Sequence, residues 1–278
     1  MRINTNIASL TAQEASTNVN KNLSSSLEKL STGLRINKAS DDSSGMAIAD
    51  KLRTQASSIG QGIANANSAN TFIQIADKAM AEQSNILDIV KSKLMQASTS
   101  TTSSDGRAAI LNDVKALLTQ FDSISTSTNY NGTTLLKGAD FNFQIGEKTT
   151  DTVKVSTTFA IDTSSISGTG SSLGELKSTT TTLAAADALS LMSAVDTALT
   201  NLNTVRSEFG SGQNQVESAL RNMMTTKTNL KAAESIIRDV DYAAESANFN
   251  KQNIIAQAGT YAISQANSVQ QNVLKLLQ

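Results

Sequence analysis

The chain has no proline anywhere in its 278 residues. At the usual frequency of about 5%, a chain of this length would contain roughly 14 prolines. Proline removes a helical N–H group and clashes with the preceding turn, so it interrupts helices. Its absence therefore favours long, uninterrupted helices.

Apolar residues spaced three and four apart run through the N-terminal half and predict three helices. The second is predicted from about Met46 to Gln96, behind capping side chains at 41–45, and the third carries the apolar series from Leu111 to Ile124. The first has the seam Ala12, Ala15, Val19, Leu23, Leu27, Leu30 and Leu34.

The same spacing returns in the C-terminal half. A helix from Leu183 to Ile237 would be about 80 Å long, which suits a bundle or a filament better than one compact core. As a helix, the Ala-rich C-terminal tail would bury little apolar area, so by itself that helix would be only marginally stable. Its seam is Ile255, Ala258, Ala262, Ala266, Val269, Val273 and Leu276.

The middle of the chain has a different pattern. Apolar residues alternate at Phe141, Phe143 and Ile145, and a second alternating run follows, which predicts a β-hairpin. The second run is Val153, Val155, Phe159 and Ile161. From Thr163 to Thr182, 12 of 20 residues are Ser or Thr, so we expect an exposed loop without a core of its own.

These patterns predict a mainly α fold: a long antiparallel helical bundle or coiled coil, with a small β-hairpin region and a Ser/Thr-rich surface excursion in the middle. We expect three parts. Residues 1–43 and 242–278 would form a terminal coiled coil, residues 44–140 and 183–241 a long-helix bundle, and residues 141–182 the hairpin and exposed loop.

The composition excludes most familiar chemistry. Without Cys or His there is no thiolate nucleophile, His-based triad or Cys/His zinc site. We therefore expect that the protein is not an enzyme and that it has no catalytic residues, cofactor or metal site. A net charge of −1 and 4% aromatic residues argue against nucleic acid binding. No apolar stretch reaches the length of a membrane span, and the N-terminus lacks the apolar core of a secretory leader.

Three motifs resemble those of the bacterial flagellins. They are Leu30-Ser31-Thr32-Gly33-Leu34-Arg35-Ile36-Asn37 with its continuation to Ala49, Ile237-Arg238-Asp239-Val240-Asp241-Tyr242-Ala243-Ala244-Glu245, and the C-terminal run from Gln265 to Leu277. The resemblance covers about the first 145 and the last 90 residues. It implies a short flagellin with little or no outer domain.

The resemblance implies a structural subunit that polymerises into the flagellar filament for swimming motility. The subunit would be extracellular, exported without a cleaved Sec-type signal peptide, and its termini would pair into the innermost coiled coil. Its partners would be other copies of itself, a flagellin export chaperone, the filament cap protein and the hook–filament junction protein. Alternatives that remain are a flagellin-like hook–filament junction protein and, in a different class, a secreted helical binding module or effector.

Weak terminal helices need neighbours, so we expect folding of the termini to be coupled to assembly. Leu34→Asp or Leu276→Asp should then block polymerisation. The predicted assembly seam is Leu23, Leu27, Leu30, Leu34, Ile255, Ala258, Ala262, Ala266, Val269, Val273 and Leu276.

Two surface features complete the sequence-based expectations. Flagellins sensed by Toll-like receptor five have an Arg-x-Arg-Glu-Leu pattern near Ile89, Lys91 and Ser92, where this chain lacks the first Arg and the Glu, so we expect weak receptor activation. Candidate O-glycosylation sites, by similarity to other flagellins, are Ser164, Ser165, Ser167, Ser171 and Ser172.

Overall fold

The computed structural model describes residues 5–156, 160–166, 173–178 and 183–276 and divides into two compact units. Unit 1 comprises residues 1–56 and 228–278, and unit 2 comprises residues 57–227. The helices are α1 (Ile7–Thr32), α2 (Ser43–Ser98), α3 (Ser104–Ser127), α4 (Leu173–Ser178), α5 (Ala185–Arg238) and α6 (Tyr242–Leu276). The strands are β1 (Asn129–Tyr130), β2 (Thr133–Thr134), β3 (Asp140–Gln144) and β4 (Thr152–Ser156). The predicted mainly α fold is confirmed.

The helices begin and end where local chemistry dictates. The Asn6 side chain accepts a hydrogen bond from the N–H of Ser9 at the start of α1, and Asp42 accepts one from Gly45 at the start of α2. Gly33 ends α1 in the left-handed conformation, with φ 74°, and its N–H bonds to the carbonyl of Lys29. Between these stops α2 runs for 56 residues and α5 for 54.

Both hairpins follow from the sequence pattern. In β3–β4, Phe141 pairs with Val155 and Phe143 with Val153, so the alternating apolar residues share one face. The β1–β2 turn has positive φ at Asn131 (50°) and Gly132 (81°), which is the conformation that an Asn-Gly hairpin turn requires. The predicted hairpin is confirmed over residues 140–156, and Phe159 lies outside the described residues.

Unit 2 contains the main hydrophobic core. Buried side chains of α2, α3 and α5 pack together with those of β4 and the segment that follows it. Phe72 of α2 meets three aromatic rings edge-on, those of Tyr130, Phe141 and Phe143, at centroid distances of 6.0, 4.5 and 5.3 Å. The hairpins are therefore part of the bundle core, and the long helices support them.

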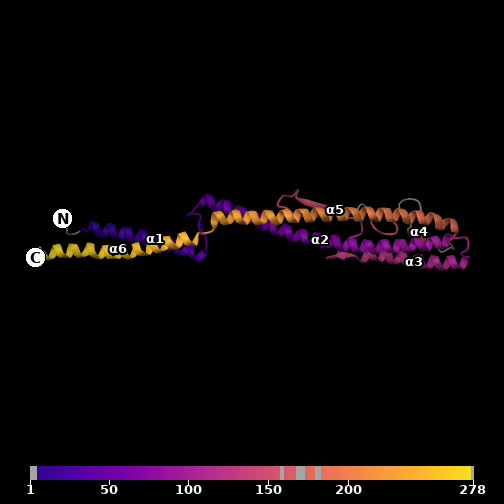
Figure 1. Cartoon of the computed structure of the whole chain (residues 1–278), viewed down its shortest axis with the longest axis horizontal. Helices are drawn as coiled ribbons and strands as arrows, with labels where there is room; N and C mark the ends of the chain where they lie inside the picture. Colours follow the sequence, from indigo (N-terminus) through magenta and orange to yellow (C-terminus); the bar gives the residue numbers. More distant parts are fainter. Residues whose placement is uncertain (1–4, 157–159, 167–172, 179–182, 277–278) are drawn as a thin grey trace. The chain divides into compact units, whose positions relative to one another are not determined.

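The expectation that residues 163–182 form an exposed loop without a core is wrong for part of the described chain. Ile166, Leu173 and Leu176 are buried, as is the polar Thr163. The segment does not need a core of its own, because its few apolar side chains enter the core formed by the long helices. Figure 1 shows α4 lying against the bundle of unit 2, in contact with α3.

In unit 1 the two ends of the chain lie side by side. Helices α1 and α6 run antiparallel, with both termini at the same end of the pair (Figure 1). The Asn6 side chain donates to the carbonyl of Ala266 at 3.0 Å, and Ser26 donates to the Glu245 carboxylate near the opposite end. Among the described residues of this unit, only Ile36, Ala49 and Ala56 are fully buried apolar side chains.

Candidate assembly surface

The surface between α1 and α6 mixes small and polar residues with a few larger apolar ones, and nearly all of them are only half-buried. Ser26, with 2% of its surface exposed, is the one seam residue that is fully buried among those described. The half-buried positions repeat every three and four residues. They are Ser9, Ala12, Ser16, Val19, Leu23 and Leu30 on α1, and Glu245, Phe249, Gln252, Ala256, Gly259, Ile263 and Ala266 on α6. Such a seam buries little apolar area per turn, so the pair is weakly held.

A compact junction joins the inner ends of the paired helices. Leu34 and Asp239 form an antiparallel bridge. On either side of it, the N–H of Arg35 donates to the carbonyl of Arg238 at 2.6 Å, and the N–H of Val240 donates to the carbonyl of Gly33 at 3.0 Å. These bonds link the end of α1 to the turn that precedes α6.

Side chains reinforce the junction. The Arg35 guanidinium donates to the carbonyl of Ile237 at 2.6 Å, and the Arg238 guanidinium lies 3.6 Å from the Asp50 carboxylate. Gly33 has a positive φ that L side chains rarely adopt, and the hydroxyl of Tyr242 lies 2.9 Å from the point that a Cβ there would occupy, so a larger residue would strain the backbone and displace the ring. The motifs that the sequence singled out near each end of the chain therefore meet in one cluster.

The connection between α1 and α2 is held by carboxylates. Asp41 accepts hydrogen bonds from the backbone N–H groups of Lys38 and Asn37, and these bonds hold the pKa of the Asp41 carboxyl below its usual range. Lys38 also pairs with Glu28 of α1 at 2.7 Å, and this bond raises the pKa of the lysine. Both interactions fix the chain direction as it leaves α1.

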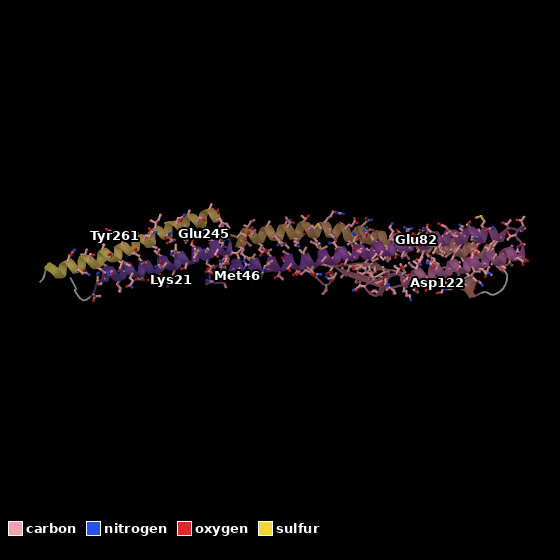
Figure 2. The ribbon with its side chains drawn as sticks, turned by 90° about the horizontal axis from the view of Figure 1, so that it is seen from below. Lys21, Met46, Glu82, Asp122, Glu245 and Tyr261 are labelled. Atoms are coloured by element: carbon pink, nitrogen blue, oxygen red, sulfur yellow. The ribbon has the colours of Figure 1, made fainter. Side chains whose placement is uncertain are left out.

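Helix α6 has an apolar face that the described residues of unit 1 leave exposed. Ile254 is 68% exposed and Tyr261 is 73% exposed, and Ala258 between them is also exposed. Tyr261 is labelled on α6 in Figure 2, beside the neighbouring α1 with Lys21. A third face of α6 is polar and also exposed: Asn250, Asn253, Gln257, Thr260 and Ser264.

Unit 1 has more such exposed apolar side chains than unit 2. Of the 15 large apolar residues that are exposed in the described chain, ten belong to unit 1. They are Ile7, Leu10, Leu27, Ile48, Ile236, Tyr242, Ile254, Ile255, Tyr261 and Val269. Exposed apolar groups that gather on one part of a molecule mark an interaction surface.

The predicted assembly seam occupies two different surfaces. Leu23, Leu30, Leu34 and Ala266 are half-buried. Leu27, Ile255, Ala258, Ala262 and Val269 are exposed, and the side chains of Val273 and Leu276 lie outside the described part of α6. Whether these residues form contacts between subunits stays a prediction.

Apart from Ala266, the predicted seam misses the face of α6 that meets α1. That face follows the series Phe249, Gln252, Ala256, Gly259 and Ile263, in which a glutamine and a glycine occupy seam positions. A search for apolar residues alone passes over it. The signal that could have found it is the strict heptad spacing, counted without regard to polarity.

The other predicted surface residues are separate from the terminal pair. Ile89 and Ser92 are exposed on α2, and Lys91 forms an ion pair with Asp196 of α5 at 2.5 Å. Ser164 and Ser165 are exposed, whereas Ser167, Ser171 and Ser172 lie outside the described residues. Within the described ranges, we find neither a metal-ligand cluster of three or more acidic, His or Cys side chains nor a helix apolar enough to cross a membrane.

Comparisons with known proteins agree on one family. Residues 3–140 match the family model of the bacterial flagellin N-terminal helical region, and residues 192–277 match that of the C-terminal helical region. The flagellar filament 33 kDa core protein of Treponema phagedenis is 32% identical over 291 residues, which is 100% of both chains.

Flagellin B of Helicobacter pylori is 52% identical over 157 residues, which is 56% of this chain, and the match covers 30% of that relative's length. A solved structure described as a flagellar hook-associated protein of Vibrio parahaemolyticus superposes with a TM-score of 0.59 at 13% identity. The match covers 71% of this chain and 99% of that one, and at this identity it shows the fold alone.

Proposed function

Because the chain belongs to the bacterial flagellin family, we propose that it is a structural subunit that polymerises with copies of itself into a flagellar filament. The filament would serve swimming motility. The observation that carries the proposal is the exposed apolar face of α6, with Ile254, Ala258 and Tyr261, on a helix that α1 holds only weakly.

Assembly would complete the terminal pair. Among the side chains that the structure describes, the seam between α1 and α6 has no large apolar residue that is fully buried, although each helix exposes large apolar residues on another face. Burying a Tyr or Ile side chain against a neighbouring copy contributes about 1.5–3 kcal/mol. Several such contacts per copy would stabilise termini that the isolated subunit leaves marginal, so folding and polymerisation would be coupled.

The proposal is tested by adding one negative charge to either face of α6. Ile254→Asp places a carboxylate on the exposed apolar face, and Asn253→Asp places one on the polar face a single residue away. We expect Ile254→Asp to abolish polymerisation in a sedimentation assay, because burying an unpaired charge is costly. The amount of sedimented polymer formed by Asn253→Asp should be within about twofold of that of the parent chain, since the polar face stays in contact with water.

Electron microscopy of the pellets distinguishes uniform filaments from aggregates. Equal polymerisation by the two variants would contradict the proposed role of the apolar face. A hook–filament junction protein, the alternative within the same class, would contribute a trace of the mass of sheared filaments. The proposed subunit would account for most of that mass.

The finer division of the chain is part of the proposal. Residues 1–43 and 242–278 would line the filament core, residues 44–140 and 183–241 would form the next shell, and residues 141–182 would face outward. The subunit would act outside the cell, after export without a cleaved Sec-type leader. An export chaperone, a cap protein and a junction protein would be its partners.

Two further properties are proposed for surface residues of unit 2. Weak activation of Toll-like receptor five would follow from the altered segment at Ile89, Lys91 and Ser92, and strong signalling by purified monomer in a reporter assay would contradict it. O-glycosylation would occur in the Ser/Thr-rich segment, where Ser164 and Ser165 are exposed. An intact mass equal to that of the bare chain would contradict it.

A further inference from the structure

We propose that the junction between Gly33–Arg35 and Arg238–Tyr242, together with the Ser26–Glu245 contact, sets the register in which α1 and α6 pair. We call this group of contacts the register clamp. The inference rests on the proposed function only in that a filament needs every subunit to present the same terminal pair. It assigns to the two sequence motifs a role beyond general stability.

The seam itself discriminates poorly between registers. On α1 its positions repeat every seven residues as Ser9, Ser16, Leu23 and Leu30. On α6 they repeat every seven residues as Glu245, Gln252, Gly259 and Ala266, which are all polar or small. Sliding one helix by a heptad leaves the α1 residues, Leu23 and Leu30 included, against small or polar residues of this α6 series, so little apolar packing is lost.

The connecting segment also permits such a slide. A heptad corresponds to about 10 Å along a helix. Residues 33–42 link α1 to α2, and an extended chain spans about 3.3 Å per residue. The link could absorb the shift if nothing held its first residues in place.

The register clamp does hold them. The two backbone bonds around the Leu34–Asp239 bridge fix the end of α1 at one height relative to the start of α6. About two helical turns before Leu34, toward the N-terminus of α1, the buried hydroxyl of Ser26 donates to the Glu245 carboxylate, which also accepts from the Asn248 side chain. A hydrogen bond to a charged group that is partly desolvated is strong, and a heptad slide would leave that carboxylate against the seam without its buried donor.

Cysteine cross-linking measures the register directly, because the chain has no cysteine of its own. A Cβ on Gly259 would lie 3.8 Å from the Cβ of Ser16, which is the usual spacing across a disulfide. Ser16→Cys with Gly259→Cys therefore reports the observed register. Ser9→Cys with Gly259→Cys and Ser16→Cys with Ala266→Cys report slides of one heptad in the two opposite directions, and in the observed register these pairs are about 10 Å too far apart.

Each pair is introduced into the full chain, alone and with Gly33→Val, which combines a β-branched side chain at positive φ with the Tyr242 contact. The matched control is Gly132→Val, which has the same kind of strain at φ 81° and no neighbour within 4 Å. A second variant, Ser26→Ala with Glu245→Ala, removes the side-chain contact and leaves the backbone unstrained. Intrachain disulfides are quantified under mild oxidation, both in polymer and in unassembled chain at the same concentration.

We expect only the 16–259 disulfide in the parent and in Gly132→Val. In Gly33→Val, through backbone strain at the junction, and in the Ser26/Glu245 double variant, through loss of one charge-assisted hydrogen bond, the ratio of slipped to observed disulfide should rise by about tenfold or more. Retention of the 16–259 disulfide alone in both variants would overturn the inference, and so would slipped disulfides in the parent. If the parent chain formed only the 16–259 disulfide and yet did not polymerise, that result would instead count against the proposed function.

Discussion

The backbone carbonyl of Ile145, just beyond β3, lies against Gly62 of α2 so closely that a methyl group on Gly62 would collide with it. Beside this contact the Asn65 side chain donates to the carbonyl of Gln144 at 2.9 Å. A glycine inside a long helix weakens that helix, so its presence here has a packing reason. It lets the β3–β4 hairpin rest directly on α2.

We therefore expect Gly62→Ala to destabilise unit 2 by about 1–3 kcal/mol, because the obstacle is backbone and cannot rotate away. The matched control is Gly210→Ala in α5, where a Cβ would have no neighbour within 4 Å. That change should stabilise the protein by about 0.5–1 kcal/mol, through helix propensity alone. Urea denaturation measures both, and a Gly62→Ala variant as stable as Gly210→Ala would contradict the packing role.

The amide of Gln83 lies fully buried between α2, α3 and the segment after β4. It donates to the carbonyl of Phe121 at 3.1 Å and to that of Ile161 at 3.4 Å, and its own oxygen has no partner among the described residues. Gln83→Ala should cost about 2–4 kcal/mol, because it leaves a cavity and loses both bonds.

Gln83→Met keeps the volume and removes the unpaired oxygen along with the donor. We expect the free energy of unfolding of Gln83→Met to lie within about 1.5 kcal/mol of that of the parent chain, measured by urea denaturation. If the two variants were equally destabilised, the hydrogen bonds rather than the packing would dominate at this position.

Asp122 of α3 (labelled in Figure 2) ties down the Ser/Thr-rich segment. Its carboxylate accepts from the backbone N–H and the hydroxyl of Thr163, both at 2.9 Å, and from Lys177 at 2.8 Å. Asp122→Ala should cost about 2 kcal/mol, since hydrogen bonds to a charged group are among the stronger ones. Amide exchange should increase at Thr163 and at Gly174, whose N–H bonds to the Thr163 carbonyl.

The control for this variant is Asp113→Ala on the same helix. Asp113 pairs with Lys93 at 2.9 Å on an exposed surface, and such pairs contribute less than about 1 kcal/mol. Its loss should leave exchange at Thr163 unchanged. An Asp122→Ala variant with unaltered exchange there would show that apolar burial alone holds the segment.

The side chains of Asp140 and Lys154, which are diagonal neighbours across the β3–β4 hairpin, form an ion pair at 2.7 Å. The hydrogen bond from Lys154, followed by that from Ser156, holds the pKa of the Asp140 carboxyl below its usual range. Because this pKa is lower in the folded than in the unfolded chain, the carboxylate stabilises the hairpin above the ordinary Asp pKa, about 3.9. That contribution is lost as pH falls through the lowered value.

Carboxyl NMR titration of the full chain measures this pKa. Lys154→Met should raise the pKa of Asp140 toward its ordinary value, and Asp140→Asn should remove the acid-dependent part of hairpin stability. An unchanged Asp140 titration in Lys154→Met would show that the ion pair does not persist in solution.

The sequence alone predicts the five long helices and the β3–β4 hairpin, because each depends on local periodicity. It fails where one segment depends on a distant one. The burial of Ile166, Leu173 and Leu176 could not be read from a Ser/Thr-rich stretch, since their core is supplied by helices elsewhere in the chain. The face of α6 that meets α1 was missed for the same kind of reason, because Gln252 and Gly259 are not apolar.

What the sequence determined by itself is the set of elements and the weakness of the two terminal helices, since the spacing and size of side chains along one segment fix both. Only the tertiary structure decided which faces of those helices meet and which remain exposed. It also decided that Gly33 and Tyr242, more than 200 residues apart, share one junction. The physical reason is that pairing over such distances depends on shape and on hydrogen bonds between segments, and neither is encoded in the neighbours of any one residue.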